Sequence, residues 1–180
     1  MKLKLVTLSI LLPILGGCAS YPLTPVNGNG GILIGTDVDN NGAHHPCRKI
    51  VVSMYEMISG GEYSETPVEL EFMPKQRESY ALFTDIKPGY YVIKNMRCYS
   101  QAQRYFNDGE QFLDSSYSHG ETIEANKITV MRYSYYGKSY NDGSFSSYLT
   151  YDSPDIEETG IKAEIKSDPN FAGWSFREQY

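Results

Sequence analysis

The segment that begins at Asp37 has the ligand spacing of a calcium-binding loop in its first half only. Asp37, Asp39 and Asn41 stand at the first, third and fifth positions, and a glycine follows, as such loops require. The twelfth position is Arg48 instead of a bidentate glutamate, and the ninth is His45. An Asx- and Gly-rich turn after a strand explains the same residues. We expect no metal site, and keep the three oxygen ligands as weak candidates.

Groups suited to acid–base or nucleophilic catalysis are present without a recognisable arrangement. The three histidines are His44, His45 and His119, and neither a nucleophile elbow nor a zinc-protease motif accompanies them. Residues 137–139 are Gly-Lys-Ser but lack the earlier glycine of a phosphate loop. The adjacent carboxylates at 157–158 suit a solvated surface. We expect no catalytic residue, no cofactor and no enzyme activity.

The N-terminus has the composition of an export signal. Lys2 and Lys4 precede an apolar stretch over 5–15, and two small residues follow, as at a cleavage site. The apolar stretch is shorter than the roughly 20 residues that cross a bilayer. We therefore expect residues 1–17 to be a removed signal peptide, and a short uncleaved anchor is the alternative.

Leu15-Gly16-Gly17-Cys18 resembles the lipobox of bacterial envelope lipoproteins. The resemblance implies that Cys18 becomes the mature N-terminus and carries lipid on its sulfur and its amine. Several acyl chains anchor a protein stably, since each buried methylene contributes about 0.8 kcal/mol. The next residue is Ala19 instead of the aspartate that favours inner-membrane retention. The resemblance therefore implies the outer membrane, facing the periplasm, with the cell surface as the alternative.

The charge balance excludes one class of partner and limits how the membrane is held. The chain has 16 basic and 22 acidic residues, a net charge of −6. Loss of Lys2 and Lys4 with the signal peptide makes this −8. An acidic chain lacks the basic footprint of a nucleic-acid binder, and anionic lipid surfaces repel it. We expect membrane attachment through the lipid, and no nucleic-acid partner.

The two remaining cysteines, Cys47 and Cys98, predict one disulfide. Paired thiols in an exported protein are normally oxidised. Closing this loop contributes about 4 kcal/mol in the chain-entropy model. The alternative is a metal site in which Cys47 joins His44 and His45, but side chains of adjacent histidines diverge.

After a tether at 18–31, rich in Gly, Pro and Asn, we expect a single domain over 32–180. Short runs of β-branched and aromatic residues, separated by turn residues, predict about seven strands of an antiparallel β-sandwich. The predicted strands are 32–36, 48–57, 67–73, 80–83, 90–99, 127–136 and 145–151.

The stretch 83–93 holds Ile86-Lys87-Pro88-Gly89-Tyr90, a turn between two predicted strands. It resembles a segment of the transthyretin-like and carboxypeptidase-regulatory-like sandwiches. The resemblance implies a binding, adhesive or accessory module, and it implies no catalytic residues.

The C-terminal part combines two signals. Ser153, Pro154 and Asp155 have the order of a helix start, whereas the residues at 161–166 alternate as in a strand. We expect a short helix over 154–167. Alternation around Trp174 indicates a last strand or a packed tail.

Tyrosine is concentrated at 133–151, mixed with Ser, Gly and Asn. This composition is typical of contact surfaces, where tyrosine supplies rigid amphipathic area. Stacking on sugars is an alternative, and so are cross-strand aromatic pairs that only stabilise a sheet. The partner-binding candidates are Tyr133, Tyr135, Tyr136, Tyr140 and Tyr148.

One strand over 127–136 would put Tyr133 and Tyr135 on the face opposite Ile128 and Val130. If the aliphatic pair faces the core, the two tyrosines point outward. We therefore expect Tyr135 to be exposed, and its replacement by alanine to leave stability nearly unchanged.

These features predict a non-enzymatic lipoprotein, anchored in the outer membrane, that binds or braces another envelope protein. One alternative is an accessory lipoprotein of a secretion or surface-assembly machine. Another is a carbohydrate-binding or hydrolytic envelope protein, which the aromatic stretch alone favours.

Overall fold

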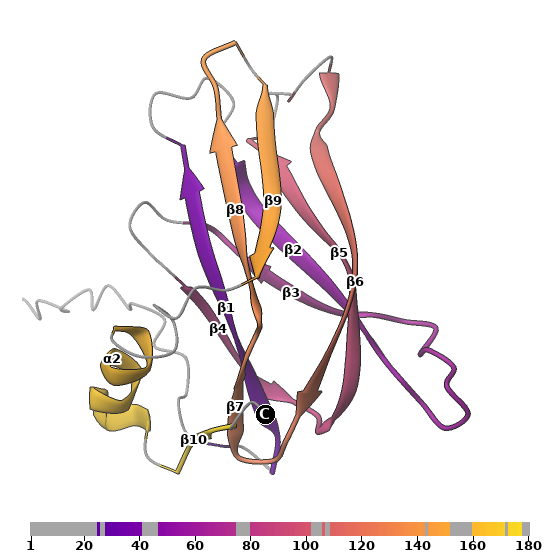
Figure 1. Ribbon diagram of the computed structural model, residues 1–180, viewed down its shortest axis with the longest axis vertical. Coiled ribbons are helices and arrows are strands. Elements are labelled where there is room, and N and C mark those ends of the chain that lie inside the picture. The colour runs from indigo at the N-terminus through magenta and orange to yellow at the C-terminus, as the bar shows by residue number, and fades with distance from the viewer. Residues whose placement is uncertain are drawn as a thin grey trace, which may run out of the picture.

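The computed structural model describes residues 25, 28–40, 47–74, 80–101, 106, 109–142, 144–151, 160–171 and 173–177. Within these residues the protein is mainly β, with two sheets and one short helix (Figure 1), as predicted, although the strands number ten instead of about seven. The elements are β1 (Gly30–Asp39), β2 (Cys47–Glu56), β3 (Val68–Phe72), β4 (Tyr80–Ile86), β5 (Gly89–Ser100), β6 (Phe112–Ile123), β7 (Lys127–Val130), β8 (Tyr133–Ser139), β9 (Phe145–Tyr151), α2 (Ile161–Ser167), the 3-10 helix η2 (Pro169–Phe171) and β10 (Ser175–Phe176).

β1 is the central strand of the first sheet. Its first half pairs antiparallel with β4 on one side and parallel with β7 on the other. Its second half, Thr36–Asp39, pairs parallel with β8, and β9 then forms an antiparallel hairpin with β8. The parallel pairs depart from the predicted antiparallel pattern, because β7 and β8 enter this sheet from β6, not by a hairpin from β1.

The second sheet is antiparallel throughout, in the order β3-β2-β5-β6. Four of its residues, Ile50, Val52, Ile93 and Met96, are fully buried and pack against the first sheet. Burial of such aliphatic side chains contributes about 1.5–3 kcal/mol each, so the main core lies between the two sheets.

The first sheet is buried on both faces in its lower half, which holds the first half of β1 and lies beside α2 in Figure 1. Ile32 and Ile34 of β1 enter the main core, while Leu33 between them joins a second apolar cluster with Ile128 and Val130. The helix α2 and the C-terminal segment cover this second cluster with Ile161, Ile165, Phe171 and Trp174. Successive residues of a strand point to opposite faces. Because both faces of β1 are covered here, the three consecutive apolar residues 32–34 are all buried.

Several elements differ from the sequence prediction. The strand expected over 127–136 is broken at Met131–Arg132 into β7 and β8. β6 was not predicted. The tether ends earlier, because Gly30 and Gly31 belong to β1; a Cβ on Gly31 would lie 2.7 Å from the Phe83 carbonyl oxygen. The helix α2 starts after Gly160, while the predicted cap at 153–155 lies outside the described residues.

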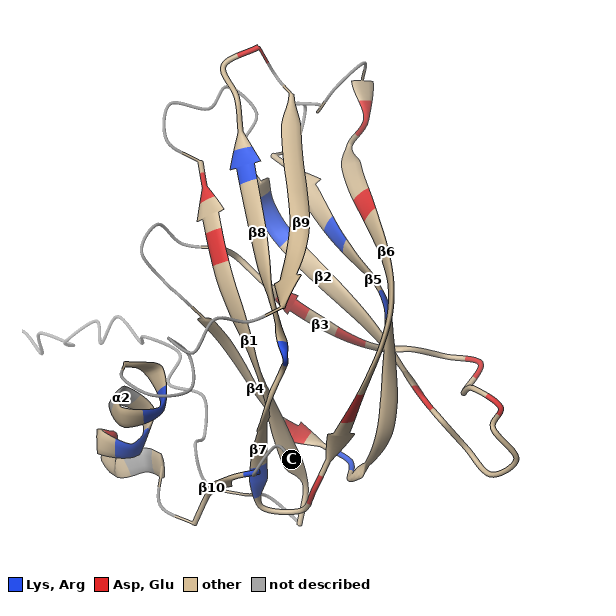
Figure 2. Cartoon of the chain, in the orientation of Figure 1, with Lys and Arg blue, Asp and Glu red and all other residues tan. Residues whose placement is uncertain are grey.

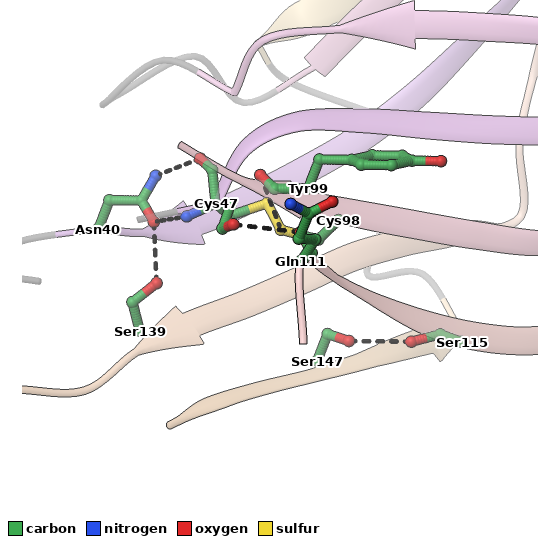
Figure 3. Close-up of a disulfide and its surroundings, with 9 residues drawn as sticks. Asn40, Cys47, Cys98, Tyr99, Gln111, Ser115, Ser139 and Ser147 are labelled. Carbon is green, nitrogen blue, oxygen red and sulfur yellow. Dashed lines mark hydrogen bonds between the residues drawn. A yellow bond between two sulfur atoms is a disulfide. The ribbon is translucent and has the colours of Figure 1, made fainter. Parts of the chain in front are cut away.

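The predicted disulfide is confirmed. Cys47 at the start of β2 and Cys98 near the end of β5 are bonded, with their Cα atoms 5.7 Å apart, and both are fully buried (Figure 3). Asn40 stands beside them. Its amide donates to the Cys47 carbonyl at 2.9 Å, and its oxygen accepts from the Cys47 N–H and the Ser139 hydroxyl at 3.0 Å each. The bridge joins the neighbouring strands β2 and β5 of the second sheet, and the hydrogen bonds of Asn40 tie the upper ends of the two sheets together.

Across the part of the chain that the structure describes, no helix is long and apolar enough to span a membrane.

Candidate partner-binding face

The outer side of the first sheet changes character along β1. Leu33 and Asp37 lie on the same side of the strand, four residues apart. Leu33 lies beneath α2 in the lower half, which we call the covered face. Asp37 is exposed in the upper half, where Figure 1 shows no helix over β1, β8 and β9. We call this upper region the open face; its outward residues are Asp37, Asp39, Tyr136, Lys138, Tyr140, Ser146 and Tyr148.

The strand register arranges the open face in rows. Asp37 pairs with Tyr136, and Tyr136 pairs with Tyr148, so one acid and two phenols stand side by side across three strands. The rings of Tyr136 and Tyr148 are stacked, with centroids 5.5 Å apart and an interplanar angle of 10°. Such an aromatic pair contributes about 0.5–1.5 kcal/mol beyond its buried area. The stack therefore holds both rings in a defined orientation on the sheet.

A second row begins at Asp39 and continues through Lys138 to Ser146. The Lys138 Nζ lies 5.5 Å from the ring centroid of Tyr140, within the range of a cation–π contact. Figure 2 shows the acidic residues of β1 and the single lysine of β8 at this end of the sheet. The open face is thus mixed in charge and rich in phenol groups.

A tight turn supports the end of this face. The Tyr140 N–H donates to the Ser144 carbonyl at 2.9 Å. The Ser144 hydroxyl and N–H both donate to the Asp142 carboxylate, at 2.7 and 2.9 Å, and these bonds lower the pKa of Asp142. An acid that bonds the backbone two residues on forms an Asx turn. The β8–β9 hairpin that carries the tyrosines is thereby fixed at its tip.

Of the five tyrosine candidates, three lie on the open face and two do not. Tyr140 and Tyr148 are 42% and 59% exposed, and Tyr136 is half-buried beside them. The expectation that Tyr135 is exposed is wrong: it is 1% exposed and belongs to the main core. Tyr133 packs against the same core.

The alternation behind that expectation is correct. Tyr133 and Tyr135 do lie opposite Ile128 and Val130, but the aliphatic pair faces the cluster under α2, and the two tyrosines face the main core between the sheets. Burial raises the pKa of Tyr135 to about 12, because the neutral phenol is favoured away from water. Tyr135 is therefore a core residue and leaves the set of contact candidates.

A polar cluster on β6, on the side of the second sheet that faces the first, was not predicted from the sequence. The imidazole of His119 lies 3.0 Å from the carboxylate of Glu121, which is buried and also accepts the Arg132 N–H at 3.1 Å. The His119 ring meets Tyr133 edge-on at 4.6 Å. Among the described residues, no hydroxyl or thiol is hydrogen-bonded to His119. The bond from the Arg132 N–H to Glu121 fixes the chain where β7 ends and β8 begins. The cluster could not be predicted because His119 and Glu121 belong to β6, a strand that was not predicted.

The residues predicted as weak metal-ligand candidates lie partly in β1 and partly outside the described residues. Asp37 and Asp39 lie within β1, not in a loop. The side chain of Asn40 is hydrogen-bonded to Cys47 and Ser139. Asn41, His44 and His45 lie outside the described residues, as does Cys18. In the ranges that the structure covers, no group of three or more His, Cys, Asp or Glu side chains is placed to hold a metal ion.

Comparisons of the chain with protein-family models, with curated proteins and with solved structures found no match. A two-sheet β fold hosts many unrelated activities, so the fold alone assigns no function to this chain.

Proposed function

We propose that the protein is an outer-membrane lipoprotein, anchored through Cys18, that binds another envelope protein through its open face. The role is non-enzymatic. Support for the anchor comes from the export signal and the lipobox resemblance at Leu15-Gly16-Gly17-Cys18. The disulfide agrees with an oxidising compartment.

The binding role is supported by a contrast between the lower and upper halves of the outer side of the first sheet. The lower half is apolar and the chain covers it with its own helix. The upper half keeps Tyr140 and Tyr148 exposed, with Tyr148 held opposite Tyr136 by strand pairing. Tyrosine is enriched at protein contact sites, because it offers a large apolar body and a polar tip. A second protein is the occupant that this composition fits.

The anchor is tested by metabolic lipid labelling. The native chain should incorporate labelled fatty acid and fractionate with the outer membrane. Cys18→Ser should lose the label and leave the membrane fraction or accumulate unprocessed. Label that persists in Cys18→Ser would disprove lipidation at this residue.

The binding face is tested by capture of partners from cross-linked envelopes. Tyr140→Ala with Tyr148→Ala should lower recovery of one stoichiometric protein, since aromatic hot spots typically contribute 2 kcal/mol or more to binding. Tyr63→Ala is the matched control, because Tyr63 is 41% exposed on the β2–β3 connection, away from the open face. Equal recovery with both kinds of variant would contradict the proposal, and retention on glycan without any protein would favour a carbohydrate-binding role.

A further inference from the structure

The strand β9 forms one edge of the first sheet and has no charged residue. Exposed edge strands pair with other chains, and proteins usually prevent this with charges, prolines, bulges or very short strands. The other edge strands of the described chain have such protection: β3 and β6 each hold two acids, β4 holds Asp85, and β10 has two residues. β9 has seven residues without a charge or a proline, and it pairs with β8 without a register shift.

The backbone on the outer edge of β9 points away from the sheet. The Tyr140 N–H donates to the Ser144 carbonyl at 2.9 Å, and the pairing of β8 with β9 continues from there. Opposite residues of an antiparallel pair alternate between bonded and non-bonded, so Tyr148 bonds β8 while Ser147 and Leu149 direct their N–H and C=O groups outward. Among the described residues, neither of these two has a backbone hydrogen bond on that side. The edge therefore offers bonding groups to one more strand.

The side chains hold β9 in place without covering its edge. Leu149 packs inward against the main core. The hydroxyls of Ser147 and Ser115 are hydrogen-bonded at 2.9 Å, which joins β9 to β6 of the second sheet. On the outer side the ring of Tyr148 stacks on that of Tyr136, yet Tyr148 remains 59% exposed. The strand is thus fixed by contacts above and below the sheet, while the edge in the plane of the sheet stays available.

From this arrangement we propose that β9 pairs antiparallel with β9 of a second copy of the chain, about a two-fold axis that passes between their Tyr148 residues. Ser147 then lies opposite Leu149 of the second copy, and each such pair exchanges backbone hydrogen bonds in both directions. Tyr148 lies opposite Tyr148 as a non-bonded pair, with Cα atoms about 4.5 Å apart. The first sheet continues across the dimer. The inference goes beyond the proposed function, because it concerns the edge of the sheet and not the open face.

A second copy is the occupant because β9 is complementary to itself in this register. Tyr148 meets an aromatic ring and Ser146 meets the hydroxyl of Thr150, and such cross-strand pairs are favourable. All seven residues of each strand have an opposite residue, whereas a shift of two residues leaves two unpaired on each strand. The same full overlap of β3 with itself would put Glu69 opposite Glu71, and like charges opposite one another are destabilising.

Two-fold symmetry also limits the size of the assembly. The contact uses the same edge of both copies, so it closes at two chains and does not extend into a filament. The row of stacked rings, Tyr136 and Tyr148, then meets the same row of the second copy at the axis. The dimer therefore joins two open faces into one continuous surface.

The test is disulfide cross-linking between copies of the full chain in intact membranes, read on non-reducing gels. Tyr148→Cys should give a covalent dimer under mild oxidation, because the Cα separation at the axis is within the range that a disulfide spans. Tyr63→Cys is the matched control for chance collisions, since Tyr63 is 41% exposed on the β2–β3 connection, and it should give little dimer.

The register is tested by two further variants. Ser146→Cys and Thr150→Cys should each fail to cross-link alone, because the same residue of the second copy lies about 13 Å away along the strand. Cells that express both variants together should form the mixed dimer, since Ser146 and Thr150 are opposite one another across the axis.

Charge variants at the axis test the pairing without introduced thiols. Two differently tagged native chains should co-purify from solubilised membranes. Tyr148→Lys on both chains should lower this recovery about tenfold, because two like charges then meet at the axis. Tyr148→Lys on one chain and Tyr148→Glu on the other should restore it. Circular dichroism of each variant, whose side chain is exposed, verifies that the fold is intact.

Three outcomes would overturn the inference: no dimer from Tyr148→Cys in folded, membrane-bound protein, equal dimer from Tyr63→Cys, or cross-linking of Ser146→Cys alone as strong as that of the mixture. Tyr140 lies outside the register of β9 and separates the two proposals. If cross-linking fails while Tyr140→Ala still lowers envelope capture, the dimer is wrong and the proposed function stands. If the dimer forms while Tyr140→Ala leaves capture unchanged, the dimer stands and the proposed binding face is wrong.

Discussion

The covered face and the open face belong to one sheet and share the strand β1, yet they are completed differently. In the covered face the outward residues are aliphatic, and Ile165, Phe171 and Trp174 pack on them. In the open face the outward residues are tyrosines, a lysine and an acid, and two of the tyrosines stay exposed. The difference shows which surface the chain uses for its own folding and which it leaves for another molecule.

The two halves are also stabilised by different means. Apolar burial under α2 serves the lower half. The upper half is tied to the second sheet by the hydrogen bonds of Asn40 to Ser139 of β8 and to Cys47, whose disulfide joins β2 to β5. The upper half is therefore packed on its inner side only, through Val38, Tyr135 and Phe145, and polar ties hold its end.

The largest expected effect is on the covered face. Trp174→Ala should lower the free energy of unfolding by about 3–5 kcal/mol, as a buried aromatic typically does. Trp174→Phe should cost much less, because the indole N–H has no hydrogen-bond partner among the described residues. Denaturant unfolding of both variants measures this. A small loss for Trp174→Ala would mean that the C-terminal segment does not cover the sheet.

The disulfide should matter next, and mainly in the upper half. Replacing Cys47 and Cys98 by serine should cost about 2–4 kcal/mol. Hydrogen exchange should accelerate most at the ends of β2 and β5 that the bridge joins, and in β8 more than in β7, because Asn40 links Cys47 to Ser139. Uniform acceleration along the first sheet would show that the two halves are not stabilised separately.

Alkaline pH should lower the stability of the fold through Tyr135, which is buried in the main core beneath the open face. Its pKa is raised from 10 to about 12 by burial, so the neutral phenol stabilises the fold below pH 10, and this contribution is lost between pH 10 and 12. Two pKa units correspond to about 2–3 kcal/mol. Tyr135→Phe should therefore unfold at a higher pH than the native chain in an alkaline titration followed by circular dichroism. Identical midpoints would contradict the buried position.

The smallest effect on stability is expected on the open face. Tyr148→Ala should lower the free energy of unfolding by no more than about 1.5 kcal/mol, because an exposed side chain contributes little beyond its aromatic stack. Only its stack with Tyr136 is lost. Thermal unfolding beside Trp174→Ala gives the comparison directly, and a similar loss for both would erase the distinction between the two faces.

Sequence patterns predicted the parts of the fold that depend on local alternation. Strands such as β3, where Glu69 and Glu71 flank the buried Leu70, follow from period two alone, and the pairing of Cys47 with Cys98 follows from their number. β6 escaped notice because its inward positions include Ser115 and His119, whose polar side chains bond Ser147 and Glu121 instead of forming an apolar pattern.

Tyr135 shows the limit of alternation more clearly. The period places it opposite Ile128 correctly, yet alternation does not say whether one side of a sheet or both are covered. That depends on where α2 packs, a contact between parts of the chain far apart in sequence. The tyrosine cluster was therefore found from composition, while its division into Tyr135 inside and Tyr148 outside required the strand register.

The most direct test of the open face is site-specific photo-cross-linking in intact envelopes. A photoreactive phenylalanine derivative replaces Tyr148 in one variant and Ala163, exposed on α2 over the covered face, in another. We predict a discrete protein adduct from position 148 and none of the same size from position 163. Identical adducts from both positions, or none from position 148 in folded and membrane-bound protein, would contradict this prediction.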